Sequence, residues 1–298
     1  MKNIIVVTGG AGFIGSNLIE NLVKQFNYKI ISIDNYSSGK RENHIKNSKI
    51  IYLKGNTKNI TKILKNYKKK IHSIFHFGEF SRIFQSFIQY NQCYDSNIKS
   101  SSEVFKFALE NKIKLIYSAT SASLGNYGKD MNLSPYAFTK ATNLQLLENL
   151  KKWFNFRFEV VYFYNVYGPK HIRKGDMATV VGIFEDHYKK RKLLPVVKPG
   201  SQSRKFTHVL DTVKGCIFAW KKNLCKHYII ANSTSYTILQ LAKMFGRPIK
   251  FLAKRSGERF SSNITEKNFN NKLIRLEANI SLKDYIKNFI QNESLNKN

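Results

Sequence analysis

Residues 4–15 read Ile-Ile-Val-Val-Thr-Gly-Gly-Ala-Gly-Phe-Ile-Gly, an apolar run followed by a glycine-rich turn and the start of an amphipathic segment. Gly10, Gly12 and Gly15 have the spacing Gly-x-Gly-x-x-Gly. Glycines at these points allow a tight turn and a close approach of the backbone to a pyrophosphate, and a following helix N-terminus stabilises the anion. The stretch therefore predicts a strand, a loop and a helix that bind a dinucleotide.

A second apolar run, residues 28–33, ends at Asp34, which lies 19 residues beyond Gly15. An acidic residue at this point accepts hydrogen bonds from the adenosine ribose and repels a 2′-phosphate. The spacing favours NAD over NADP as the cofactor. Lys40 and Arg41 are the counter-argument, because either cation in this polar loop has the reach to bind such a phosphate.

Apolar strand patterns alternate with amphipathic helix patterns through the first half of the chain. This alternation is typical of a parallel sheet with helices on both faces. We expect an α/β fold, a Rossmann-type doubly wound parallel sheet, with strands near residues 3–8, 28–33, 49–53, 71–77, 113–118 and 157–163 and helices near 12–25, 58–68, 92–111 and 135–153.

The pattern becomes irregular after Pro169, where short strand and helix signals mix. We predict a small interwoven C-terminal α/β lobe that binds the substrate. The NAD-binding domain then takes residues 1–165 and about 206–231, and the second lobe takes 166–205 and 232–298. Short strands are expected near 193–197, 205–208, 226–231 and 249–253, and helices near 176–190, 210–222, 236–245 and 281–291.

The chain has 50 basic and 19 acidic residues, a net charge of +31. Such an excess suggests nucleic-acid binding, because clustered Lys and Arg neutralise phosphates. Here the basic residues are spread along the chain, and the short runs 68–70 and 189–192 fit solvated helix ends. We expect no nucleic-acid partner, although a positive field attracts a diphosphate substrate.

No apolar run approaches the roughly 18 residues needed to cross a membrane, and the four-residue apolar run at the N-terminus fits a strand better than a signal peptide. Cys93, Cys216 and Cys225 are odd in number and widely spaced, which argues against a disulfide framework. These features predict a cytoplasmic protein with reduced cysteines and no membrane partner.

Tyr136 and Lys140 form the candidate catalytic pair. The chain holds three Tyr-x-x-x-Lys pairs, so the spacing alone is weak evidence. The context of the middle pair is more specific: the strand-like run 114–118 leads to Thr120, a glycine-bearing loop follows, and Pro135 opens a helix. Residues four apart share a helix face, so the phenol and the ammonium should lie together near a strand end.

Taken together, the motifs resemble the extended short-chain dehydrogenase/reductase family, and more narrowly its nucleotide-sugar epimerase/dehydratase group, in particular the 4-epimerases. The resemblance implies NAD as cofactor and a nucleotide-diphosphate sugar as substrate. It runs from residue 3 to about 258 through the glycine loop, Asp34-Asn35, His76-Phe77-Gly78, Asn97, Thr120, Tyr136-x-x-x-Lys140, Asn165-Val-Tyr-Gly-Pro169, Arg204-x-Phe-Thr-His-Val209 and Arg255-Ser-Gly-Glu258.

The resemblance implies that Tyr136 is the base that takes a proton from a sugar hydroxyl, that Thr120 binds the same hydroxyl and that Lys140 holds the nicotinamide ribose. The role requires the pKa of Tyr136 to fall well below its usual value of about 10, which a neighbouring ammonium favours. The implied cofactor contacts are Gly9, Gly10, Gly12, Phe13, Ile14, Gly15, Asp34, Asn35, Asn56, Phe77, Gly78, Asn97, Ser118, Tyr136 and Lys140.

Asn97 is expected to order a water behind Lys140, with helix capping as the alternative. The implied substrate contacts include three arginines, whose planar guanidinium binds two phosphate oxygens at once. A surface salt bridge is the alternative for each arginine. The full substrate set is Ser81, Arg82, Asn165, Arg204 and Arg255.

Some residues depart from the family pattern. Ser121 and Ala122 stand where dehydratases carry Asp-Glu, which disfavours 4,6-dehydration. Asn56 replaces an Asp that reads adenine, a task an amide can also perform. In the unusually charged loop 78–82, Arg82 either faces phosphate or pairs with Glu79.

We therefore expect an NAD-dependent nucleotide-sugar epimerase that inverts C4 of a UDP-hexose through a transient 4-keto intermediate. A 4-ketoreductase or a decarboxylase on the same scaffold is the main alternative. A non-catalytic nucleotide- or nucleic-acid-binding protein is the alternative from a different class, because fold does not fix function.

Two further expectations concern metals and assembly. His72 and His76 are four apart in a strand, where four residues span about 13 Å, so they cannot share one ion and no metal site is predicted. Apolar stripes over Val104–Leu109 and Leu144–Leu150 fit either an ordinary core or, as in the family, a homodimer interface. We expect a homodimer.

Overall fold

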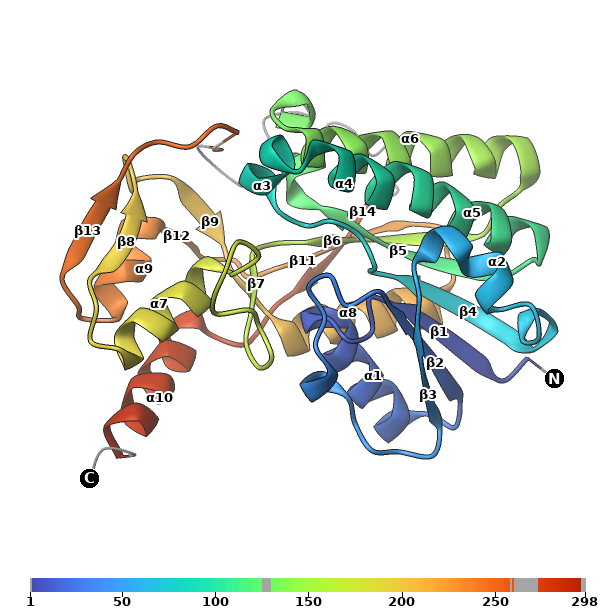
Figure 1. Ribbon diagram of the computed structural model, residues 1–298, viewed down its shortest axis with the longest axis horizontal. Coiled ribbons are helices and arrows are strands. Elements are labelled where there is room, and N and C mark those ends of the chain that lie inside the picture. The colour runs from blue at the N-terminus through green and yellow to red at the C-terminus, as the bar shows by residue number, and fades with distance from the viewer. Residues whose placement is uncertain (1, 125–129, 258, 260–272, 296–298) are drawn as a thin grey trace.

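A parallel sheet organises the computed structural model, which describes residues 2–124, 130–257, 259 and 273–295 (Figure 1). Among these residues, eight strands join in the order β14-β11-β6-β5-β4-β1-β2-β3, and neighbours pair in parallel. Their bounds are β1 Ile4–Thr8, β2 Lys29–Asp34, β3 Ile50–Lys54, β4 Ile71–His76, β5 Lys114–Thr120, β6 Phe158–Phe163, β11 His227–Ala231 and β14 Leu273–Glu277.

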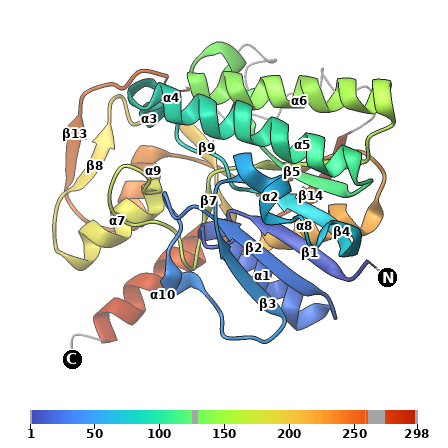
Figure 2. The same ribbon diagram turned by 45° about the vertical axis from the view of Figure 1, so that its right-hand side comes forward.

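Helices cover both faces of this sheet (Figures 1 and 2). On one face α1 (Phe13–Gln25) packs beside α8 (Val209–Lys222), and on the other lie α2 (Ile60–Ile63), α5 (Ser101–Glu110) and α6 (Pro135–Phe154). All five residues of β1 are buried, because alternate side chains enter the two apolar layers. The predicted Rossmann-type architecture is confirmed.

The helical stretch before β5 is longer and less regular than predicted. It consists of α3 (Ile83–Ile88), which the sequence did not predict, then α4 (Tyr90–Tyr94), a π-helical turn η4 (Asp95–Ser100) and α5. A π turn inserts one extra residue into a helix and is often found at functional sites. The predicted helix 58–68 is wrong in its length, because the short 3₁₀ segment Thr57–Asn59 leads into α2 and α2 already ends at Ile63.

A second lobe lies beyond the carboxyl ends of the strands, at the left of Figure 1. Tyr167, Phe184 and Phe245 are among the aromatic residues of its own apolar cluster. Its elements are β7 Val166–Tyr167, α7 Val180–Lys189, β8 Leu194–Val197, β9 Ser203–Lys205, β10 Thr207–His208, β12 Ser235–Thr237, α9 Ile238–Met244, β13 Ile249–Leu252 and α10 Leu282–Leu295. In it β7 pairs with β10, β8 with β13 and β9 with β12.

One segment departs from the predicted division into lobes. Residues 232–298 were assigned to the second lobe, whereas β14 pairs with β11 at the edge of the large sheet. The strand is half exposed and includes Arg275 and Glu277, so its sequence lacks the continuous apolar pattern of the buried strands.

Four residues of the apolar stripes that suggested a dimer interface face the interior of this chain. Val104, Phe105, Ala108 and Leu147 are at most 1% exposed and belong to the cluster between α5, α6 and the sheet. Leu109, Leu144 and Leu150 are partly buried and pack against the same cluster, so the ordinary-core alternative accounts for the buried part of both stripes.

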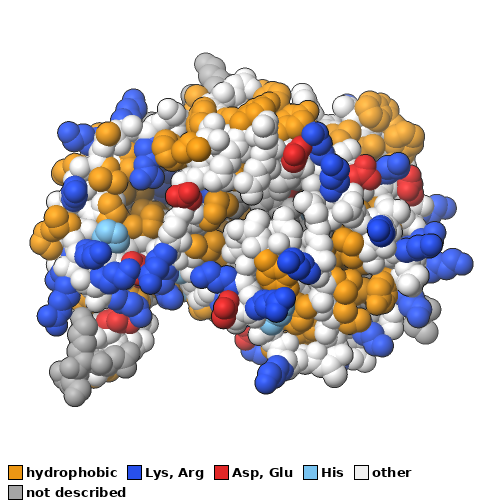
Figure 3. All heavy atoms as spheres, in the orientation of Figure 1, with side chains coloured by type: hydrophobic (Ala, Val, Ile, Leu, Met, Phe, Trp, Pro, Cys, Tyr) orange, Lys and Arg blue, Asp and Glu red, His pale blue; other side chains and the backbone are white. Residues whose placement is uncertain are grey.

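The surface and the cysteines bear on the remaining compositional expectations. Figure 3 shows basic side chains spread over both lobes on the visible face. Within the described residues, no helix is long and apolar enough to cross a membrane. Cys93, Cys216 and Cys225 are free thiols.

The order of the strands locates the site. The chain proceeds from β1 through β2 to β3 on one side, and then β4 returns to the other side of β1. In open parallel sheets, ligands bind beyond the carboxyl ends of the strands where the order reverses in this way. The segments that follow β1 and β4 meet at this point.

Candidate active site

The glycine loop leaves β1 in a conformation that needs its glycines. Gly9 has φ +70°, and a Cβ built on it would lie 2.8 Å from the backbone of Phe77. A Cβ on Gly10 would lie 2.2 Å from Ser32 Oγ, and one on Gly15 would lie 2.2 Å from the Gly9 carbonyl oxygen. The positive φ therefore occurs at Gly9, one residue before the Gly-x-Gly-x-x-Gly triplet.

The start of α1 fits an anionic group. Gly12 is the N-cap residue and, having no side chain, leaves the first turn of α1 without a side-chain cap. A Cβ on Gly12 would meet only the backbone of Gly9 within 4 Å. The first-turn residues Phe13 and Ile14 are partly exposed. Free amide groups and open space at a helix N-terminus suit a pyrophosphate.

Asp34, at the end of β2, is tied to the glycine loop. Its Oδ2 accepts a hydrogen bond from the Ala11 amide at 2.9 Å, and its Oδ1 accepts one from the Tyr36 amide at 2.8 Å. Burial raises the pKa of this carboxyl, and the backbone donors oppose the rise. Asn35 closes the following turn by accepting from the Ser37 amide at 3.0 Å.

A surface cavity of about 430 Å³ adjoins Asp34. Gly39, in its wall, approaches Asp34 so closely that an added Cβ would lie 2.8 Å from the carboxylate. Lys40 and Arg41 lie in the same wall, so the two cations weighed against NAD are placed near the Asp34 carboxylate. The lining residues are Tyr36, Gly39, Lys40, Arg41, Glu42 and Lys54.

The side chains of Asn56 and Asn97 hydrogen-bond other segments of this chain. Asn56 Oδ1 accepts from the Lys58 amide at 2.9 Å and from Ser100 Oγ at 3.1 Å. Asn97 lies in the π turn and binds both backbone groups of Phe80, accepting from its amide at 2.7 Å and donating to its carbonyl at 3.1 Å. The capping alternative for Asn97 is wrong, because the residue lies inside a continuous helical stretch.

Thr120, Tyr136 and Lys140 come together as predicted. Thr120 is the last residue of β5, and Tyr136 and Lys140 lie one turn apart in α6. Helix α6 begins here because Ser134 Oγ accepts from the Ala137 amide at 3.1 Å and Pro135 occupies the first turn. All three side chains are at most 9% exposed, and Thr120 hydrogen-bonds the Tyr136 phenol.

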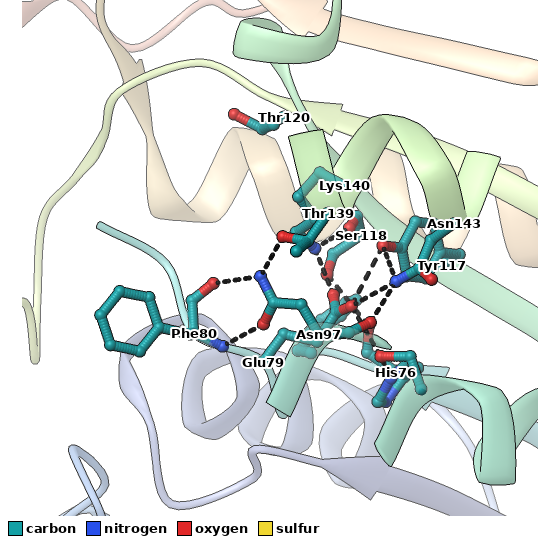
Figure 4. A network of polar contacts seen from close by, with 12 residues as sticks. His76, Glu79, Phe80, Asn97, Tyr117, Ser118, Thr120, Thr139, Lys140 and Asn143 are labelled. Carbon is teal, nitrogen blue, oxygen red and sulfur yellow. Dashed lines mark hydrogen bonds and ion pairs between the residues drawn. The ribbon is translucent and has the colours of Figure 1, made fainter. Parts of the chain in front are cut away.

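Lys140 has a buried carboxylate as its partner. Its Nζ donates to the Ser118 carbonyl oxygen at 2.5 Å and forms an ion pair with Glu79 Oε2 (Figure 4). The predicted alternative of a pair between Glu79 and Arg82 is wrong. Arg82 instead donates through Nε to the Met177 carbonyl oxygen at 3.0 Å.

The pKa of Tyr136 moves opposite to the expected direction. Burial raises it to about 12; the hydrogen bond from Thr120 lowers it, the charge of Glu79 raises it and Arg82 lowers it. The predicted fall below 10 is therefore wrong for the chain without its cofactor. Since Glu79 balances the ammonium, Lys140 alone does not favour the phenolate.

His76 bridges two hydroxyl groups. Its Nδ1 lies 2.7 Å from Thr8 Oγ1 and its Nε2 lies 2.9 Å from Ser101 Oγ. Burial lowers its pKa to about 4, which keeps the ring neutral. In the described part of the chain, no group of three or more His, Cys, Asp or Glu side chains is arranged to hold a metal ion.

The predicted substrate residues fall into two groups, Asn165 with Arg204 and Ser81 with Arg82 and Arg255 around the start of α3. Asn165 Nδ2 donates to the Lys205 carbonyl oxygen at 3.0 Å, which places Asn165 beside the strand of Arg204. The Arg255 guanidinium lies 5.2 Å from the centre of the Phe84 ring on α3. Ser81 is exposed and binds Arg82 through its carbonyl. The last residue of the Arg255 motif, Glu258, lies outside the described residues.

The sequence interpretation missed a second ion pair at the end of β5. Arg259 Nε donates to Asp130 at 2.8 Å and its Nη1 donates to Ser121 Oγ at 3.2 Å. Its Nη2 is buried and makes no hydrogen bond in the described structure. A cation therefore contacts the position where dehydratases carry an Asp. No local pattern connects residues 129 apart, so only the fold reveals this pair.

Comparisons with known proteins support the fold of this chain. An uncharacterized UDP-glucose epimerase of Bacillus subtilis is 29% identical over 230 residues, 71% of this chain and 70% of that protein. The UDP-glucose 4-epimerase of Thermotoga maritima, solved with UDP-glucose, superposes with a TM-score of 0.84 at 22% identity and covers 99% of this chain and 100% of its own.

A dTDP-glucose 4,6-dehydratase from Streptomyces venezuelae, solved with NAD, matches the fold equally well. Its TM-score is 0.85 at 18% identity, covering 99% of this chain and 98% of its own. Fold similarity thus does not separate epimerases from dehydratases. The family model described as the NAD dependent epimerase/dehydratase family matches residues 5–231. This chain belongs to the NAD-dependent epimerase/dehydratase family, and its cofactor is NAD.

Proposed function

We propose that the chain is a nucleotide-sugar 4-epimerase that inverts C4 of a UDP-hexose through a transient 4-keto intermediate. The observation that carries the proposal is the buried hydrogen bond between Thr120 and Tyr136 in a site where Ser121 and Ala122 replace the acid pair of dehydratases. Relatives named as UDP-glucose epimerases support the substrate class.

The side chains have distinct tasks in this scheme. Tyr136 takes the proton of the 4-hydroxyl and returns it, and Thr120 holds that hydroxyl in line with the phenol. Bound NAD supplies the hydride acceptor, and since the hydride returns to the sugar there is no net oxidation. Lys140 holds the cofactor ribose and keeps a positive charge near the phenol.

The diphosphate lies between the two lobes in this proposal. Ser81, Arg82, Asn165, Arg204 and Arg255 are its contacts, with Arg255 reaching over α3 from the second lobe. The same assignment divides the chain into an NAD-binding domain and a sugar-binding lobe. A homodimer and a cytoplasmic location complete the proposal on the family resemblance alone.

Incubation with UDP-, GDP- and dTDP-hexoses, followed by NMR of the anomeric protons, tests the function. The expected result is interconversion of axial and equatorial C4 epimers without added cofactor. Stoichiometric consumption of NAD(P)H would instead support a 4-ketoreductase, and loss of carbon dioxide a decarboxylase. Salt-dependent duplex binding without turnover of any sugar would favour the non-catalytic alternative.

A further inference from the structure

We propose that Glu79 is a positioning residue that holds the Lys140 ammonium beside the Tyr136 base and balances its charge. The inference rests on the proposed function, because it gives Glu79 a role in the same proton transfer. It also goes beyond that function, since no catalytic or binding role was predicted for Glu79. The evidence lies in the contacts of the carboxylate.

Both partners of the pair are buried and held by further contacts. The side chains of Lys140 and Glu79 are 4% and 2% exposed. Lys140 Nζ also donates to the Ser118 carbonyl oxygen, so its position is fixed from β5 and from the loop after β4. Asn97 holds this loop through both backbone groups of Phe80, the residue that follows Glu79 (Figure 4).

The carboxylate accepts donors from three other elements. Glu79 Oε1 accepts from Ser101 Oγ of α5 at 2.8 Å, from Tyr117 Oη of β5 at 3.1 Å and from Asn143 Nδ2 of α6 at 3.1 Å. With Lys140 on Oε2, Glu79 accepts bonds from four donors and none of the contacts needs a proton on the acid. This pattern is that of an ionised carboxylate.

A hydrogen-bonded chain continues from Glu79 to the glycine loop. Ser101 donates its single proton to Glu79, so His76 Nε2 must donate to Ser101. Thr8 Oγ1 accepts from the amides of Phe77 and Gly78, at 3.1 Å each, and donates to His76 Nδ1. These directions place the proton of His76 on Nε2 and link Lys140 to the residue before Gly9.

The position of Glu79 has an electrostatic consequence for Tyr136. Charged or titratable groups facing Tyr136 are Glu79, Arg82 and Cys93, and those facing Glu79 include Lys140, His76 and Tyr117. Glu79 raises the pKa of Tyr136. A neutral side chain at position 79 leaves the Lys140 charge unbalanced, and an unbalanced cation stabilises the phenolate.

The test replaces Glu79 with an isosteric amide. The Glu79→Gln variant is titrated without cofactor, and ionisation of Tyr136 is followed by tyrosinate absorbance with Tyr136→Phe as the blank. The expected result is a titration moved to lower pH by about one unit or more. In the loaded enzyme, the alkaline limb of the pH–rate profile should move in the same direction.

Glu159→Gln is the matched control, because it removes the carboxylate of another buried Lys–Glu pair in the same sheet. It should leave the titration of Tyr136 unchanged. The proposal is overturned if Glu79→Gln titrates like the unmodified protein, or if both variants shift it equally. Since the absorbance titration needs no sugar, failure of the epimerase assignment leaves this result intact.

A double-variant cycle covers the case in which Glu79→Gln folds poorly. Removing one partner leaves a buried unpaired charge, whereas Glu79→Gln with Lys140→Met leaves none. The double variant should be more stable to urea than Lys140→Met alone. If the double variant is no more stable to urea than Lys140→Met alone, Glu79 and Lys140 are not coupled and the positioning role is contradicted.

Discussion

Two buried Lys–Glu pairs lie at opposite ends of the strands of one parallel sheet, here called its carboxyl edge and its amino edge. Lys140 and Glu79 meet at the carboxyl edge, after β4 and beside the end of β5. Lys114 and Glu159 meet at the amino edge, where Lys114 begins β5 and Glu159 is the second residue of β6, with their charged atoms 3.6 Å apart. The side chains of the second pair are 8% and 0% exposed.

The partners of the two pairs differ. Glu159 accepts from the backbone amides of Cys225 and Lys226 at 3.0 Å each, and Lys114 donates to the Trp220 carbonyl oxygen. Glu79 is bound mainly by side chains, and Tyr136 lies within its field. The same two residue types thus hold backbone loops at one edge, whereas at the other edge Glu79 raises the pKa of Tyr136. Ligands of open parallel sheets bind beyond this second edge.

The largest effect on turnover should come from removing the phenol of Tyr136, which lies at the carboxyl edge. Tyr136→Phe removes the proton acceptor, so turnover should fall by about 10²- to 10⁴-fold while NAD binding persists. Steady-state rates and calorimetric NAD titration measure the two quantities. Tyr188→Phe, in another Tyr-x-x-x-Lys pair, should keep full turnover, and equal losses in both variants would contradict the assignment.

Removing each lysine separates stability from chemistry. Lys140→Met leaves Glu79 buried without its cation and should cost about 3–5 kcal/mol of unfolding free energy, with loss of turnover. Lys114→Met should cost less, because the Lys114 ammonium lies 3.6 Å from the Glu159 carboxylate, whereas Lys140 hydrogen-bonds Glu79 directly. Urea unfolding and rates per folded molecule give both quantities. If Lys114→Met lost as much turnover as Lys140→Met, the two Lys–Glu pairs would not differ in their effect on the chemistry.

His76, which lies in the hydrogen-bonded chain that starts at Glu79, should make the free energy of unfolding depend on pH. The pKa of His76 falls from its ordinary 6.5 to about 4 because the ring is buried. Between these values the unfolded chain binds a proton that the folded chain does not, so stability should fall as the pH is lowered from 6.5 toward 4. At about 1.4 kcal/mol per pKa unit, the loss approaches about 3 kcal/mol.

His76→Asn is the comparison for this pH dependence, because asparagine does not titrate there. Its unfolding free energy should start lower and fall less across the same interval. Parallel curves for the two proteins would show that His76 is not the titrating group.

The amino-edge pair predicts a smaller effect in alkaline solution. Burial lowers the pKa of Lys114 from 10.5, and Glu159 opposes the shift. The unfolded chain then holds the proton more tightly, so this residue contributes a rise in stability as the pH increases toward 10.5. Thermal unfolding of Lys114→Met should lack that rise. A variant with an unchanged alkaline profile would rule out the contribution.

Local sequence patterns predicted much of the fold. The first six strands begin and end within two residues of their predicted ranges, because buried parallel strands and amphipathic helices have clear periods. The half-exposed β14 and the short α3 were missed, since an edge strand and a six-residue helix provide too few apolar positions.

The site was predictable in its residues but less so in its electrostatics. Thr120, Tyr136 and Lys140 followed from their order along the chain. The partner of Lys140 lies 61 residues away, and no periodicity connects a loop after β4 with α6. A carboxylate three residues after a buried strand, in a chain with 19 acidic residues, was the available sign that Glu79 had a specific task.

The π turn at Asp95–Ser100 constrains how the chain tolerates insertions and deletions. An extra residue within a helical turn advances everything beyond it by about 100° around the axis. That phase lets Asn97 reach the backbone of Phe80 while Ser101, in the following turn, reaches Glu79 and His76. Deleting one residue here would give a regular helix whose Ser101 hydroxyl points away from the carboxylate, so chain length in this segment is as restricted as residue identity.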